Sequence, residues 1–174
     1  VWADLLKRYP DALQLLERLT EVRETIHGPD HKETLGTLIW RTKILSKQQD
    51  FAAESALHHR IIDSEIRSLG KEHPETLNSI SILAARYSDH GQYEKAIELY
   101  QSVAETEQRV LGAEHPDTLI TLHNLAFSYA DIGEYAKAIE LNERVAEMKQ
   151  RVLGPEHPST LTTLSNLALA YGNS

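Results

Sequence analysis

The chain has 174 residues, of which 41% are hydrophobic and 25% charged, which is enough for one domain with a continuous core. It has no cysteine, which excludes disulfides, Cys-based zinc sites and thiol catalysis and favours a reducing, cytoplasmic compartment. Its net charge of -8 argues against a nucleic-acid partner, and it lacks an apolar run of about 18 residues that could span a membrane.

The most informative feature is a pentad, His-Pro-x-Thr-Leu, that recurs every 42 residues. It begins at His73, His115 and His157, and one step earlier His31 opens the same pattern with lysine in place of proline. A fixed period of this size is typical of a solenoid, in which each unit is one supersecondary element that packs on its neighbours. We therefore expect a surface for another protein rather than an active site.

The first part of the chain keeps this frame only loosely. Four residues stand two steps before Tyr93, Ala96, Leu99 and Val103 and match a second helix: Tyr9, Ala12, Leu15 and Leu19. In the next unit, Glu54 replaces the expected alanine, Gln49 the glycine and Arg41 the leucine. We expect this first complete unit to be degenerate or slightly shifted.

The later units each predict two helices. In the unit that begins near His115, Pro116 predicts a helix start, Gly133 its end, and a second helix runs from near Tyr135 to Leu153. Apolar residues at three-and-four spacing predict the buried stripe of both helices: Leu119, Leu122, Leu125, Ala126, Tyr129, Ala138, Ile139, Leu141, Val145 and Met148. We also predict that the repeated tyrosines are core residues: Tyr87, Tyr93, Tyr129, Tyr135 and Tyr171. The carboxylates of the second helices, Glu105, Glu107, Glu143 and Glu147, are predicted to lie on solvated faces.

Nothing in the sequence predicts chemistry. The connector histidines His31, His73, His115 and His157 are one repeat apart, so they cannot converge on a metal, and we predict that they cap the first helices. The chain contains no phosphate loop, no dinucleotide glycine pattern, no His-Glu-x-x-His and no Gly-x-Ser-x-Gly. We expect no metal site, no cofactor and no enzymatic activity.

The later units resemble a known repeat. They resemble the tetratricopeptide repeat (TPR) at Asn124-Leu125-Ala126, Tyr129, Gly133, Tyr135, Ala138 and Ile139. The Leu-Gly-x-x-His-Pro connector and the 42-residue step are similar to the longer form of this repeat that is found in kinesin light chains. The resemblance implies an all-α fold, a right-handed superhelix (α-solenoid) of antiparallel helix-turn-helix units. It divides a single array, 1–174, into a second helix at 1–28, a degenerate repeat at 29–70, repeats at 71–112 and 113–154, and a first helix at 155–174. Because the chain begins and ends within a unit, we expect a larger parent protein.

The resemblance also implies that the first helices line a concave groove where peptides bind. By position the groove residues are Trp40, Ser81, Ile82, Ala85, Asp89, His123, Asn124, Phe127, Asp131, Ser165, Asn166 and Leu169. Asn124 and Asn166 match an asparagine that often bonds a peptide backbone in this family, whereas Ile82 and Trp40 depart from it. Phe127 lies off the apolar stripe, so it is either a peptide anchor or an aromatic packed on the adjacent first helix.

The leading hypothesis is a scaffold that binds a peptide or protein segment in this groove. Two alternatives remain open. Similar arrays form sensor or structural arms of larger NTPase-type signalling proteins, and open repeat ends could stack, which would give end-to-end self-association. We expect a protein or peptide partner, and neither a nucleic acid nor a membrane.

Overall fold

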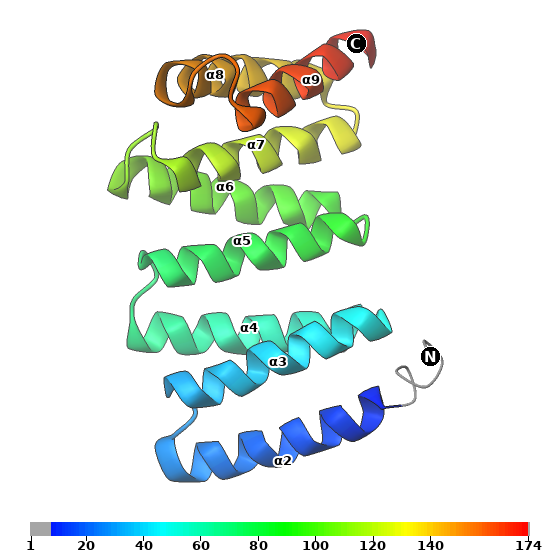
Figure 1. Ribbon diagram of the computed structural model, residues 1–174, viewed down its shortest axis with the longest axis vertical. Helices are drawn as coiled ribbons and strands as arrows, with labels where there is room; N and C mark the ends of the chain where they lie inside the picture. The colour runs from blue at the N-terminus through cyan, green and yellow to red at the C-terminus, as the bar shows by residue number, and fades with distance from the viewer. Residues whose placement is uncertain (1–7, 174) are drawn as a thin grey trace. The chain divides into compact units, whose positions relative to one another are not determined.

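The structure is a computed structural model in which residues 8–173 are described, and every regular element within them is an α-helix (Figure 1). The helices are α2 (Tyr9–His27), α3 (Lys32–Gln48), α4 (Phe51–Ser68), α5 (Pro74–Asp89), α6 (Tyr93–Val110), α7 (Pro116–Asp131), α8 (Tyr135–Leu153) and α9 (Pro158–Asn173). The chain forms two compact units that meet within α5, one ending at Ser79 and one beginning at Ile80. In the first unit α3 packs on α2 and α4, and in the second α7 packs on α6 and α8, and α8 on α9.

The pentad starts each first helix through its own side chains. The Nδ1 of His115 accepts a hydrogen bond from the backbone N–H of Asp117 at 3.3 Å, and the other three connector histidines make the same contact at 3.2 to 3.3 Å. The prediction that these histidines are caps is therefore confirmed. The pentad threonine has its own partner, since Thr118 is fully buried and donates to the carbonyl of Gly112 at 2.9 Å.

The core follows the predicted apolar stripe, with two corrections. Leu119, Leu122, Leu125, Ala126, Ala138, Leu141 and Val145 are all buried. Of the five tyrosines predicted to be core residues only Tyr87 is buried; Tyr93, Tyr129 and Tyr135 are half-buried, and Tyr171 is 53% exposed. The Tyr129 hydroxyl hydrogen-bonds Gln101. The prediction for Glu107 is also wrong, since this carboxylate is 4% exposed and faces the next first helix rather than solvent.

The degenerate unit keeps the register of the regular ones. Gln49 adopts a left-handed backbone with φ of +60°, at the position where Gly91 and Gly133 have φ of +70° and +78°. The turn is therefore the same, and the unit is not shifted. Its unusual feature is a buried polar pair, because Glu54 is 2% exposed in place of alanine and lies 3.8 Å from the ring nitrogen of His58.

Candidate binding face on the first helices

The residues predicted for the groove all lie on the helices that open a pair. Those on α5, α7 and α9 belong to the second compact unit, whereas Trp40 belongs to α3 in the first. Trp40 is 59% exposed, and the ammonium of Lys43 lies 4.6 Å from the centroid of its ring, a cation–π distance. The name first-helix face below means the predicted residues of α5, α7 and α9 only, because Trp40 belongs to the other compact unit.

Large apolar side chains on the first-helix face are open to solvent. Ile82 on α5 is 40% exposed, Phe127 on α7 is 50% exposed and Leu169 on α9 is 65% exposed. Ala85, Phe127 and Leu169 occupy the same position in three successive repeats, and Ala85 is half-buried. Phe127 is not part of the core stripe of α7, whose buried apolar residues are Leu119, Leu122, Leu125 and Ala126.

A polar cluster joins α7 to α9 on this face. His123 places Nδ1 3.3 Å from the Oγ1 of Thr163 and Nε2 3.5 Å from the amide nitrogen of Asn166. Burial lowers the pKa of His123 to about 4, and the positive charge of Lys149 adds to this shift. The imidazole is therefore neutral at pH 7, with one nitrogen as donor and one as acceptor.

Asn124 lies on the first-helix face and also hydrogen-bonds with a buried residue of the core, Tyr100. Burial raises the pKa of the Tyr100 hydroxyl to about 12, the nearby Asp89 adds to the shift, and hydrogen bonding with Asn124 opposes it. Tyr100 is 2% exposed on α6, so its hydroxyl relies on partners of this kind. The Asn124 amide is half-buried and has only part of its hydrogen-bonding capacity left for a ligand.

The remaining polar residues of the face differ in how far the fold uses them. Asp89 is exposed and pairs with Arg86 on its own helix at 2.9 Å, whereas burial alone raises the pKa of Asp131. Ser165 donates to the backbone carbonyl of Leu161 at 3.0 Å. The Ser81 hydroxyl is buried and has no partner within the described part of the chain. Its position is the one that His123 occupies a repeat later.

Sequence reasoning missed the buried charges beside this face. Lys149 is 3% exposed and donates from Nζ to Thr163 at 2.9 Å, and in the first unit the carboxylate of Glu65 accepts from Ser79 at 3.0 Å. Glu107 and Thr121 form the corresponding pair between α6 and α7. The sequence does contain a pattern that could have predicted these pairs, because a charged residue on the second helix and a hydroxyl residue on the next first helix both recur every 42 residues.

The described residues contain neither a metal-binding group nor a membrane-spanning helix. Across residues 8–173 no group of three His, Cys, Asp or Glu side chains is placed to hold a metal ion. No helix in the same range is both long enough and apolar enough to cross a membrane. The first-helix face itself presents apolar side chains, neutral hydrogen-bonding groups and the two carboxylates of Asp89 and Asp131.

Comparisons with known proteins agree with this geometry. Family models of the tetratricopeptide repeat match residues 3–33, 91–151 and 117–173. None of the curated proteins compared by sequence matches the chain.

Among solved structures, a repeat protein of Podosopora anserina, described as a kinesin light chain with nearly identical TPR-like repeats, is 28% identical with a TM-score of 0.79. The match covers 98% of this chain and 83% of that one, and another crystal structure of the same protein gives a TM-score of 0.80 with the same identity and coverage. BtubC (BKLC) of P. vanneervenii shares the fold at 19% identity, with a TM-score of 0.69 over 96% of this chain and 64% of its own. The chain therefore belongs to the tetratricopeptide repeat family, as an all-α, right-handed solenoid with kinesin-light-chain-like repeats.

Proposed function

We propose that the chain is a scaffold that binds a peptide or protein segment along the first-helix face. The observation that carries the proposal is Phe127, whose ring is half exposed on a helix whose core contacts are already made by other residues. Ile82 and Leu169 extend the apolar surface on α5 and α9. Aromatic side chains of this kind dominate the binding energy of many protein interfaces.

The neighbouring polar groups suit the main chain of a bound segment. The Nε2 of the neutral His123 imidazole lies 3.5 Å from the amide nitrogen of Asn166, and the Asn166 amide keeps a second N–H and its oxygen for a ligand, without a charge. A peptide backbone presents both kinds of group, so such side chains pair with it whatever its sequence. The apolar residues would then supply the specificity. We further propose that this binding is non-enzymatic and takes place in the cytoplasm, which the lack of cysteine favours.

The test is a binding measurement with peptides selected from a random 12-residue display library against the whole chain. Fluorescence anisotropy should show Phe127→Ala weakening the Kd of selected peptides at least about tenfold, and Asn166→Ala weakening it less. Glu147→Ala, on the exposed surface of α8, is the matched control and should leave the Kd unchanged. Equal affinity of the wild type and Phe127→Ala would remove the first-helix face from consideration.

The test needs a check on stability, because a loss of binding could come from unfolding. Phe127 is half exposed, so its truncation should cost much less than the loss of a buried leucine. Thermal unfolding followed by circular dichroism should show a Tm within a few degrees of the wild type for Phe127→Ala. A collapse of the Tm would make Asn166→Ala the deciding variant.

Self-association is a second candidate, which one observation favours. Helix α2 carries an exposed apolar stripe, with Leu15 65%, Leu19 39%, Val22 52% and Ile26 66% exposed. Exposed apolar residues that share one helix face are a candidate contact surface. Sedimentation equilibrium should then show a mass that rises with concentration in the wild type and falls back in Leu15→Glu/Ile26→Glu. A strictly monomeric wild type would exclude this candidate.

A further inference from the structure

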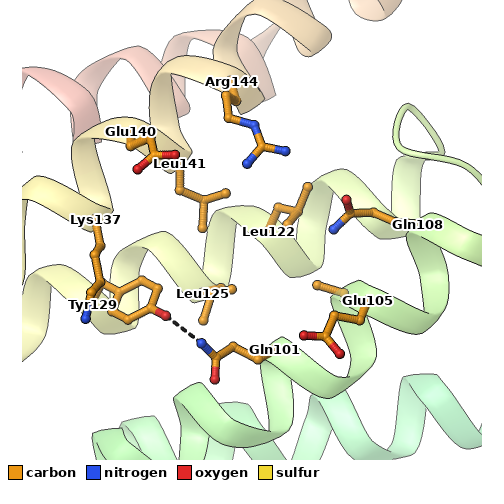
Figure 2. A pocket seen from close by; sticks show the side chains of 11 residues that line it. Gln101, Glu105, Gln108, Leu122, Leu125, Tyr129, Lys137, Glu140, Leu141 and Arg144 are labelled. Atoms are coloured by element: carbon orange, nitrogen blue, oxygen red, sulfur yellow. Dashed lines mark hydrogen bonds between the residues drawn. The ribbon is translucent and has the colours of Figure 1, made fainter.

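A pocket lies between α6, α7 and α8, on a different part of the second unit from the first-helix face (Figure 2). Its floor is aliphatic and is formed by Leu122 and Leu125 of α7, Leu141 of α8 and Ala104 of α6. The volume is about 260 Å³. Side chains of the second helices α6 and α8 stand on either side of this floor, as Figure 2 shows.

One end of the pocket is closed by a tyrosine. The Tyr129 hydroxyl and the side-chain nitrogen of Gln101 are 2.6 Å apart, and the ammonium of Lys137 lies 5.4 Å from the centroid of the Tyr129 ring. The same bridge occurs one repeat later, where the Tyr171 hydroxyl hydrogen-bonds Glu143. The bridge from a first helix to the preceding second helix is thus a recurring contact, and it holds the wall of the pocket in place.

The rim of the pocket carries charged side chains, and most of them form no ion pair within the described range. Glu105 on α6 and Glu140 and Arg144 on α8 are exposed, and none of the three makes an ion pair with a residue in the described range. Lys137 differs, because its ammonium lies 3.4 Å from the carboxylate of Glu134 and over the tyrosine ring. Glu105 lies on the α6 side of the aliphatic floor, and Glu140 and Arg144 lie on the α8 side, as Figure 2 shows.

We propose that this pocket is a second docking site, which receives one aliphatic side chain of a protein partner that carries a basic residue beside it. The volume favours a single side chain, because 260 Å³ lies below the roughly 300–1,000 Å³ of small-molecule sites. Such an anchor, buried in a small pocket with a polar rim, is the usual form of an interface hot spot.

The charges select the partner. A lysine or arginine next to the anchor would pair with Glu105 or Glu140, whereas an acidic residue there would meet two carboxylates and only one free guanidinium. The net charge of -8 on the chain also attracts basic segments and raises their rate of association. The site goes beyond the proposed function, because it lies on other residues and its partner need not be the segment that binds the first-helix face.

The test uses a defined probe, an alanine-based helical peptide of 15 residues with one central leucine and a lysine four residues to each side. Titration of the ¹⁵N-labelled chain should shift amide signals within 101–108 and 137–144. Two peptides serve as comparisons, one with serine in place of the leucine and one with glutamate in place of both lysines, and both should bind at least about tenfold more weakly.

Two variants of the chain complete the test. Glu105→Lys/Glu140→Lys should weaken the leucine–lysine probe at least tenfold, and Glu98→Lys/Glu147→Lys is the matched control, with exposed carboxylates on the same two helices but outside the pocket. Equal loss in both double variants would reduce the effect to overall charge and overturn the proposal, as would equal binding of the serine peptide. Shifts confined to α7 and α9 around Phe127 would also overturn it. Phe127→Ala should leave binding of the probe unchanged, so failure of this proposal and of the proposed function are separable.

Discussion

Lys149 donates a hydrogen bond from Nζ to the Oγ1 of Thr163 at 2.9 Å, and both side chains are almost completely buried. Burial lowers the pKa of the lysine. At the same two repeat positions the partners are a carboxylate and a hydroxyl, as in Glu65 and Ser79. The hydroxyl serves both cases because it can accept from an ammonium or donate to a carboxylate.

The Lys149–Thr163 contact predicts a strong coupling in a double-mutant cycle. Thr163→Val should lower the free energy of unfolding by about 2 kcal/mol, because it leaves a buried ammonium without its acceptor. Lys149→Met should be close to neutral, since an apolar side chain of similar length replaces a costly buried charge. Urea unfolding of both single variants and the double variant measures the coupling. Additive effects of the two substitutions would contradict this account.

Replacing the buried carboxylate of Glu107 by a neutral group should stabilise the protein in a pH-dependent way. Burial raises its pKa above the ordinary value of 4.5, and hydrogen bonding with Thr121 opposes the shift. Because the pKa is higher in the folded than in the unfolded chain, ionisation of Glu107 costs stability as the pH rises through the folded-state value. Glu107→Gln should therefore raise the free energy of unfolding at pH 7 by on the order of 1 kcal/mol, and the gain should vanish near pH 4.

Urea unfolding at the two pH values checks this expectation. The control is Glu105→Gln, which removes an exposed carboxylate two residues away and should change the stability little at either pH. An equal gain from Glu107→Gln at pH 7 and pH 4 would show that ionisation is not the cause.

The turn of the degenerate repeat predicts that a single substitution to glycine will stabilise the protein. Gln49 has a φ of +60°, which costs a residue with a Cβ atom about 1 kcal/mol, whereas glycine adopts it freely. Gln49→Gly should raise the Tm, and Gly133→Ala at the same turn of the later repeat should lower it. Space is not a factor, because a Cβ at Gly133 would meet nothing within 4 Å. Opposite signs from these two variants in thermal unfolding are the expected outcome.

The histidine caps predict a modest and chemically specific loss. His115→Ala removes the acceptor for the backbone N–H of Asp117 and should cost about 1 kcal/mol of unfolding free energy. His115→Asn should restore most of it, because an asparagine oxygen is an effective N-cap acceptor. Hydrogen exchange of the Asp117 amide gives a local readout. Rapid exchange in the alanine variant and slow exchange in the asparagine variant would fit, and no difference between them would not.

The sequence was sufficient for the features that depend on neighbouring residues. The cap of His115 and the turn at Gly133 each involve residues within one turn of the chain, so the pentad and the period predicted both. The exposure of the Phe127 side chain could also be predicted, since helical spacing places this residue off the apolar stripe. Whether this face binds a ligand stays a prediction.

Features that depend on contacts between helices were not predicted. Glu107 has the polarity of a solvent-facing residue, and only its packing against α7 explains its burial. The hydrogen bonding of Asn124 with Tyr100 likewise joins residues of two helices, and spacing within α7 alone carries no information about it. The pocket over Leu122 was missed for the same reason, because three helices contribute to it.

The hydroxyls of Ser79, Thr121 and Thr163, each the sixth residue of its first helix, have a consequence for how the repeats can vary in sequence. When a repeat is duplicated, the buried charge on its second helix can mutate from acid to base, as it differs between Glu107 and Lys149. The threonine or serine that meets it can rotate its proton and needs no matching mutation. Neighbouring copies can therefore diverge, be deleted or be recombined one at a time without a repulsive junction.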